Sequence, residues 1–274
     1  MSNWRETDRQ AALATLRDQL GRLEAAGGLD GDGASAALAT GWDAIDGVLP
    51  GGGLRLSAVH EWVDASPRTE GSRGAWSPPI LILAHLARRA LAMEPKGRHI
   101  CWIGRAVLPY GVTLVRDEDR ELLRRSIVVD PASDADRLWA IDLALRSSAV
   151  AAVIADGSKL DLNATRRLQL AAEERAGLGL LARPPTDGGR LSAAATRWRV
   201  TPAPSESFTP RWTLELARCK GAQPAQEAPR RWTLELCDAS RLVVSSNLAD
   251  GSSAAATGAR IGARHPAHHA RRSA

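Results

Sequence analysis

The loop at residues 64–77 and the aspartate at position 156 have residue types and positions that could handle phosphate. The loop, DASPRTEGSRGAWS, lies between a strand predicted at Leu56–Val63 and a helix predicted at Ile80–Met93. A glycine-rich loop that opens onto a helix N-terminus can hold phosphate with its backbone amides. The strong form of this motif ends in Gly-Lys followed by Ser or Thr. The sequence contains no Gly-Lys dipeptide, so the motif is degenerate here.

The same loop could still bind an anion through arginine. Its candidate residues are Arg68, Gly71, Arg73 and Gly74. Three prolines in and next to the loop each remove a backbone amide that could donate to phosphate. We favour the simpler interpretation, in which the segment is a connecting loop that binds no cofactor.

Asp156 directly follows the apolar strand predicted at Ala149–Ala155. In phosphate-transfer folds an acid at this position holds magnesium. The dipeptide Asp156-Gly157 is also typical of a turn at the end of a strand. Because a phosphate-binding lysine is missing, we favour the structural role for Asp156 and expect no catalytic residue.

The cysteines and histidines do not form the pattern of a metal site. Cys101, Cys219 and Cys237 are odd in number and widely spaced, which suits a reducing compartment and fits no zinc motif. Three histidines lie near the C-terminal end, and each of the others stands alone in a predicted element. We therefore expect no metal.

Arginine stands next to tryptophan in three predicted strands, at residues 197–199, 211–212 and 231–232. Such pairs could stack on the bases of single-stranded DNA. Alternation along a strand instead places tryptophan on the core face and arginine on the solvent face. We favour that second interpretation.

The elements that must position these residues alternate between helix and strand. Beyond the first strand and helix, strands are predicted at His99–Ile103, Ile127–Val129, Ala149–Ala155 and Leu178–Ala182. Helices are predicted between them at residues 115–125, 134–147 and 162–176. Apolar strands that alternate with helices indicate an α/β fold, with a mostly parallel sheet flanked by helices.

The pattern changes after Pro185, where antiparallel strands are expected at one end of the sheet. They are predicted at residues 196–200, 211–218, 231–236 and 241–244. The hexapeptide RWTLEL occurs twice, at 211–216 and 231–236, and its apolar residues alternate with polar ones. The repeat is too short to indicate a solenoid.

Three regions are expected along the chain: an N-terminal helix (9–25) and flexible linker within residues 1–37, one domain at 38–246, and a disordered basic tail at 247–274. The helix has a leucine stripe that could contact a partner or pack on its own domain, formed by Leu13, Leu16, Leu20 and Leu23. The tail could add sequence-independent affinity for DNA. Its arginines are Arg260, Arg264, Arg271 and Arg272.

The composition, 44% hydrophobic and 24% charged, is typical of a soluble globular protein. No apolar run approaches the roughly 20 residues that cross a bilayer. The charged N-terminus lacks the core of a signal peptide, so we expect a cytoplasmic protein. The formal charge of +5 is a weak indication of an anionic partner, since the excess of arginine also fits a GC-rich coding sequence.

Several segments resemble the RecA-like family. Residues 38–54 are similar to the segment that precedes the first core strand of that family, and residues 134–156 to the helix and strand that end in its Walker B aspartate. Four further segments resemble the ImuA family, a group of RecA-related accessory proteins of bacterial translesion synthesis that is also related to the cell-division inhibitor SulA. They are residues 165–171, 180–185, 196–199 and 211–216.

The resemblance implies a RecA-like core over residues 38–245 that lacks the chemistry of the family. The phosphate loop is absent from residues 64–76, and no acidic cluster follows the strand at His99–Ile103. We therefore expect a non-catalytic accessory protein, with a RecA-like DNA-dependent ATPase and a SulA-like inhibitor as alternatives. The implied partners are an ImuB-type Y-family polymerase homologue, an error-prone DNA polymerase III α-subunit paralogue, and RecA with single-stranded DNA. No membrane partner is expected.

Overall fold

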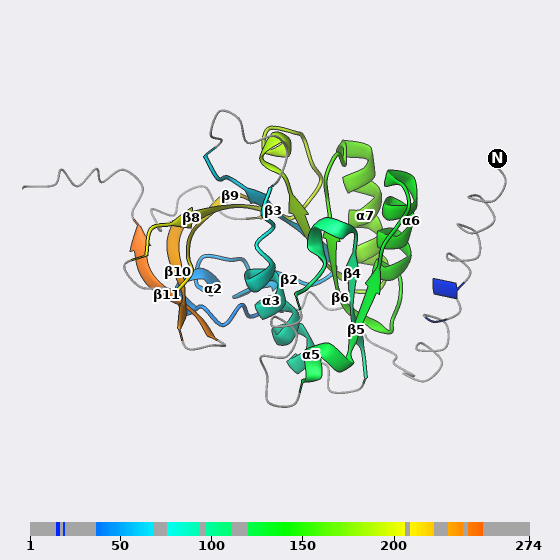
Figure 1. The fold of residues 1–274 in the computed structure, drawn as a ribbon, viewed down its shortest axis with the longest axis horizontal. Helices are drawn as coiled ribbons and strands as arrows, with labels where there is room; N and C mark the ends of the chain where they lie inside the picture. The colour runs from blue at the N-terminus through cyan, green and yellow to red at the C-terminus, as the bar shows by residue number, and fades with distance from the viewer. Residues whose placement is uncertain are drawn as a thin grey trace, which may run out of the picture.

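A computed structural model describes residues 15–16, 19, 37–67, 76–93, 97–110, 120–205, 209–221, 230–237 and 241–248. Its main feature is a nine-stranded sheet in the order β11-β10-β9-β8-β3-β7-β6-β4-β5 (Figure 1). Parallel pairing joins β3 (Ala58–Asp64), β4 (His99–Ile103), β5 (Ser126–Val129), β6 (Val150–Asp156), β7 (Leu178–Arg183) and β8 (Thr196–Ala203). Antiparallel pairing adds β9 (Arg211–Cys219), β10 (Arg231–Cys237) and β11 (Arg241–Leu248). The expected mostly parallel sheet with antiparallel C-terminal strands is confirmed.

Helices cover both faces of the parallel part of the sheet (Figure 1). The long helix α3 (Ile80–Met93) packs on one face together with the short helices α2 (Asp43–Asp46) and α5 (Glu121–Arg124). The opposite face is covered by α6 (Asp134–Leu145) and α7 (Leu162–Glu174). A small sheet of β1 (Ala37–Leu38) and β2 (Leu54–Arg55) joins the first face, and two 3₁₀ turns, η1 (Arg105–Val107) and η2 (Pro185–Asp187), follow strands β4 and β7.

Tryptophan forms much of the core on the α3 face. Trp62 and Trp198 stack with ring centroids 5.3 Å apart, and Trp232 lies 6.1 Å from Trp198. All three side chains are fully buried, and Trp212 packs against the same cluster. The prediction that the tryptophans of the late strands face the core is confirmed. Arginine lies on the opposite face, as expected, but the Arg197 side chain is only 12% exposed there, so the expected solvent exposure is wrong for this residue.

Two predicted elements are interrupted because single residues adopt left-handed backbone. The strand predicted from Leu56 begins instead at Ala58, since Ser57, with φ of 57°, separates β2 from β3. The helix predicted at 115–125 is present at Glu121–Arg124, directly after Arg120, which has φ of 51°. Residues 111–119 lie outside the described part of the chain.

Within the predicted leucine stripe, Leu16 is described and is 7% exposed. It belongs to the apolar cluster formed by the α6 and α7 face of the sheet, which favours packing on its own domain for this residue. The other three leucines, the loop candidates Arg68, Gly71, Arg73 and Gly74, and the tail arginines lie outside the described residues. No helix in the described ranges is long and apolar enough to span a membrane.

Candidate functional site

The carboxyl ends of the parallel strands bring two aspartates to the same edge of the sheet. Asp64 ends β3 and Asp156 ends β6, with β7 between these strands. Ligands of open α/β sheets bind outside this edge. The surroundings of the two carboxylates therefore show whether this edge of the sheet could bind phosphate.

Asp64 binds the two described ends of the degenerate loop. It is 4% exposed, and its Oδ1 accepts hydrogen bonds from the Ser66 amide at 2.9 Å and the Ser66 hydroxyl at 2.5 Å. Its Oδ2 accepts the amide of Ser77, just before α3, at 3.2 Å. The Asp64 carboxylate thus accepts hydrogen bonds from backbone amides in this segment, whereas the amides of a phosphate loop would donate to the ligand.

The start of α3 is poor in free donors. Pro78 and Pro79 have no N–H group, and the amide of Ile80 donates to the Pro78 carbonyl at 2.8 Å. Phosphate binding at a helix start depends on unpaired amides. The Asp64 charge and the two prolines make the described residues a poor fit for a nucleotide phosphate.

Asp156 lies in a closed polar cluster. It is 9% exposed, and its Oδ1 accepts the amide of Ser158 at 2.9 Å and also the Ser158 hydroxyl. Arg137 lies 3.6 Å from Oδ2 and donates to the Ser158 carbonyl at 2.7 Å. Gly104 packs so closely that a Cβ there would lie 2.8 Å from the Asp156 Cβ. These contacts support the structural role for Asp156.

Other groups in the described ranges offer little further chemistry. No group of three or more His, Cys, Asp or Glu side chains there could hold a metal ion. Cys101 is fully buried, and burial raises the pKa of its thiol to about 12. The thiol therefore stays protonated and is a weak nucleophile.

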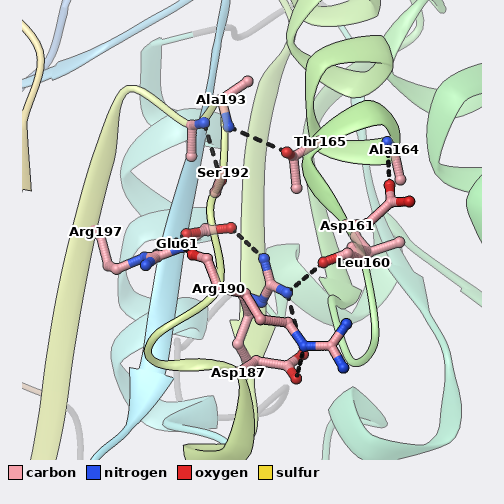
Figure 2. Close-up of polar contacts among 12 residues, drawn as sticks. Glu61, Leu160, Asp161, Ala164, Thr165, Asp187, Arg190, Ser192, Ala193 and Arg197 are labelled. Carbon is pink, nitrogen blue, oxygen red and sulfur yellow. Dashed lines mark hydrogen bonds and ion pairs between the residues drawn. The ribbon is translucent and has the colours of Figure 1, made fainter.

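A buried ionic network around Glu61 was not foreseen (Figure 2). Arg183, on β7, donates from Nη1 to Glu61 Oε1 of β3 at 2.5 Å and from Nη2 to Asp187 Oδ2 of η2 at 3.1 Å. Arg197, on β8, donates from Nε to the second Glu61 oxygen at 2.7 Å. The Glu61 and Arg183 side chains have no exposed surface. The sequence feature that could have indicated this network is the presence of charged residues inside otherwise apolar strands.

The network continues into the connection between β7 and β8. Arg197 donates to the carbonyls of residues 188 and 190, at 3.0 and 2.8 Å. Arg218, on β9, donates to those of residues 192 and 194, at 2.8 and 3.0 Å. Two arginines thus hold every second carbonyl from residue 188 to residue 194, which fixes the connection against the sheet.

No protein-family model matches this chain. Two proteins named Protein ImuA, from two strains of Caulobacter vibrioides, are each 34% identical to it over 245 residues. Each alignment covers 81% of this chain and 94% of the relative. This chain belongs to the ImuA family.

The extent of the ImuA match confirms the resemblance inferred from short motifs. An alignment over 81% of the chain goes beyond the motifs that suggested the family. The fold and site described above therefore describe a member of the ImuA family. Arg183 and Arg197 lie in two of the segments that suggested the family, residues 180–185 and 196–199, whereas Glu61 lies outside all of them.

Proposed function

We propose that this chain is a non-catalytic accessory protein of SOS-induced translesion DNA synthesis. The observation that carries the proposal is its membership of the ImuA family over nearly the whole length of the relatives. In this role it bridges an ImuB-type Y-family polymerase homologue, an error-prone DNA polymerase III α-subunit paralogue and DNA in the cytoplasm. RecA bound to single-stranded DNA is a further partner.

The surroundings of Asp64 and Asp156 support the absence of catalysis. Phosphoryl transfer depends on groups that neutralise and position the phosphates. At this sheet edge Asp64 is hydrogen-bonded to Ser66 and Ser77, while Asp156 is engaged by Ser158 and Arg137. A RecA-like fold can persist without the chemistry, because fold and function are separable.

Recovery of partners from cells tests the bridging role. The native chain, carrying an affinity tag, is isolated before and after DNA damage, and co-purifying proteins are identified. We expect both polymerase-related proteins in the damaged sample, with recovery that survives nuclease treatment. Absence of any polymerase-related protein from both samples contradicts the proposal.

ATP turnover, measured with and without single-stranded DNA, tests the non-catalytic assignment. We expect none above the background of a mock preparation. Turnover that Asp156→Ala abolishes, in a variant whose circular dichroism matches the parent, would show an active ATPase. Cell filamentation on overproduction, with direct binding to the division protein FtsZ, would instead favour the SulA-like alternative.

A further inference from the structure

A hollow of about 730 Å³ lies beside the buried ionic network, and three arginines contribute to its wall. Arg197 and Arg199 come from β8 and Arg218 from β9, while Asp64 at the end of β3 also lines the hollow. The volume is within the range of about 300–1,000 Å³ that is usual for ligand pockets. The positive charge of the three arginines is the feature that distinguishes this hollow.

The arginines of this hollow are held in place but are not fully neutralised. Arg197 shares the Glu61 carboxylate with Arg183, and its other donors meet neutral carbonyls. Arg218 is also held by carbonyls; burial, and then the positive charge of Arg197, lower its pKa. Both guanidinium groups are thus preorganised, and an added anion would relieve their mutual repulsion.

Arg199 supplies the accessible charge. It is exposed, and no ion pair or hydrogen bond joins its side chain to another residue in the part of the chain that the structure describes. The Asp64 carboxylate already accepts hydrogen bonds from Ser66 and Ser77. The turn at Gly189 leaves open space, since a Cβ there would meet no atom within 4 Å.

We propose that this hollow, the arginine pocket, binds an acidic peptide segment of a protein partner. Carboxylates would enter between Arg199, whose planar guanidinium group can donate two parallel hydrogen bonds, and Arg218, whose positive charge attracts them. The inference is independent of the role in translesion synthesis, because it rests only on the charge and geometry of the pocket.

The neighbouring strands favour a peptide over a nucleic acid. Beyond Arg199, the arginines on this face of β9 and β10 are already paired: Arg231 with Glu215 and Arg211 with Glu235. A phosphate backbone carries a charge at every step, so a strand running from the pocket across β9 and β10 would meet charges that are already neutralised. A peptide can place acids at the pocket and neutral residues over these ion pairs.

Fluorescence anisotropy with the full chain tests this proposal. The probe is a short fluorescein-labelled peptide with three consecutive aspartates between glycines and serines, and the comparison is the same peptide with asparagines. We expect the aspartate peptide to bind at least about tenfold more tightly, and Arg199→Ser to weaken it by about tenfold. Added salt should reduce the difference.

Arg166→Ser is the matched control, because Arg166 is exposed on α7 and its loss changes the net charge equally. It should leave peptide binding unchanged. Equal binding of the two peptides, or equal effects of the two substitutions, overturns the proposal.

Labelled oligothymidylate forms the other arm of the experiment. A loss of oligothymidylate binding in Arg199→Ser that exceeds the loss of peptide binding would assign the pocket to nucleic acid instead.

Discussion

At the scale of single residues, burial decides how much an arginine–glutamate pair contributes to the stability of the fold. Glu61 and Arg183 are joined at 2.5 Å with no exposed side-chain surface. Glu215 and Arg231 are joined at 3.1 Å with 29% and 44% of their side chains exposed. Both pairs join strands of the same sheet. The first pair lies in a medium where an unpaired charge is costly, whereas water screens the second.

Glu61→Gln should therefore destabilise the protein strongly. It removes the one charge that faces both Arg183 and Arg197, whose side chains are 0% and 12% exposed. Leaving buried charges without their partner costs about 3–5 kcal/mol. The free energy of unfolding, measured by urea denaturation, should fall by about that amount.

The matched control is Glu215→Gln, the same chemical change in the exposed pair. It should cost no more than about 1 kcal/mol. Similar losses for the two variants would show that the network around Glu61 does not depend on its charge.

At the scale of elements, the RWTLEL repeat sets how β9 and β10 pair. The two copies run antiparallel about a centre at Thr213 and Thr233, so the arginine of each copy lies opposite the glutamate of the other. Arg211 bonds to Glu235 at 2.9 Å and Arg231 to Glu215 at 3.1 Å. The two copies of the repeat thus form a self-complementary strand pair. The sequence pattern predicted only that apolar and polar residues alternate along each copy.

A double-mutant cycle on Glu215 and Arg231 should reveal this complementarity. Glu215→Arg places arginine beside both Arg199 and Arg231 on one face, and we expect a loss of about 0.5–1 kcal/mol. Adding Arg231→Glu restores opposite charges on β9 and β10 and should recover most of that loss. Urea denaturation of the four proteins gives the coupling free energy. Purely additive effects would contradict the pairing.

At the scale of the whole molecule, buried histidines make stability depend on pH. Burial lowers the pKa of His60 from 6.5 to about 4, and burial also lowers the pKa values of His85 and His99. His60 is neutral in the fold: its Nε2 donates to the Arg55 carbonyl and its Nδ1 accepts from the Thr196 hydroxyl. The unfolded chain gains a proton near pH 6.5, so acid favours unfolding.

The contribution of His60 is fully present above pH 6.5 and is lost as the pH falls towards 4. Between pH 7 and pH 5 this corresponds to about 2 kcal/mol, at 1.4 kcal/mol for each pH unit. Urea denaturation of the parent should show that decline, and His60→Gln should show a shallower one. Equal declines in the two proteins would mean that His60 is not the group that titrates.

Much of the fold could be predicted from local sequence. Alternating helices and apolar strands indicated the parallel sheet, and the period of two in RWTLEL placed Trp232 in the core. The interruptions at Ser57 and Arg120 were missed, because left-handed backbone carries no strong signal in residues other than glycine. Strands β8 and β11 also run further than predicted, to Ala203 and Leu248. The structural role favoured for Asp156 agrees with its contacts to Ser158 and Arg137.

Local sequence is enough to predict the fold class, the inward face of the late strands and the ImuA resemblance, because these depend on period and on order along the chain. The contacts of the charged residues become visible only in the folded sheet. Glu61 meets Arg183 across 122 positions and Arg197 across 136. Whether a carboxylate meets an arginine or a phosphate loop amide depends on strand order and register, and these are settled only when the whole sheet assembles.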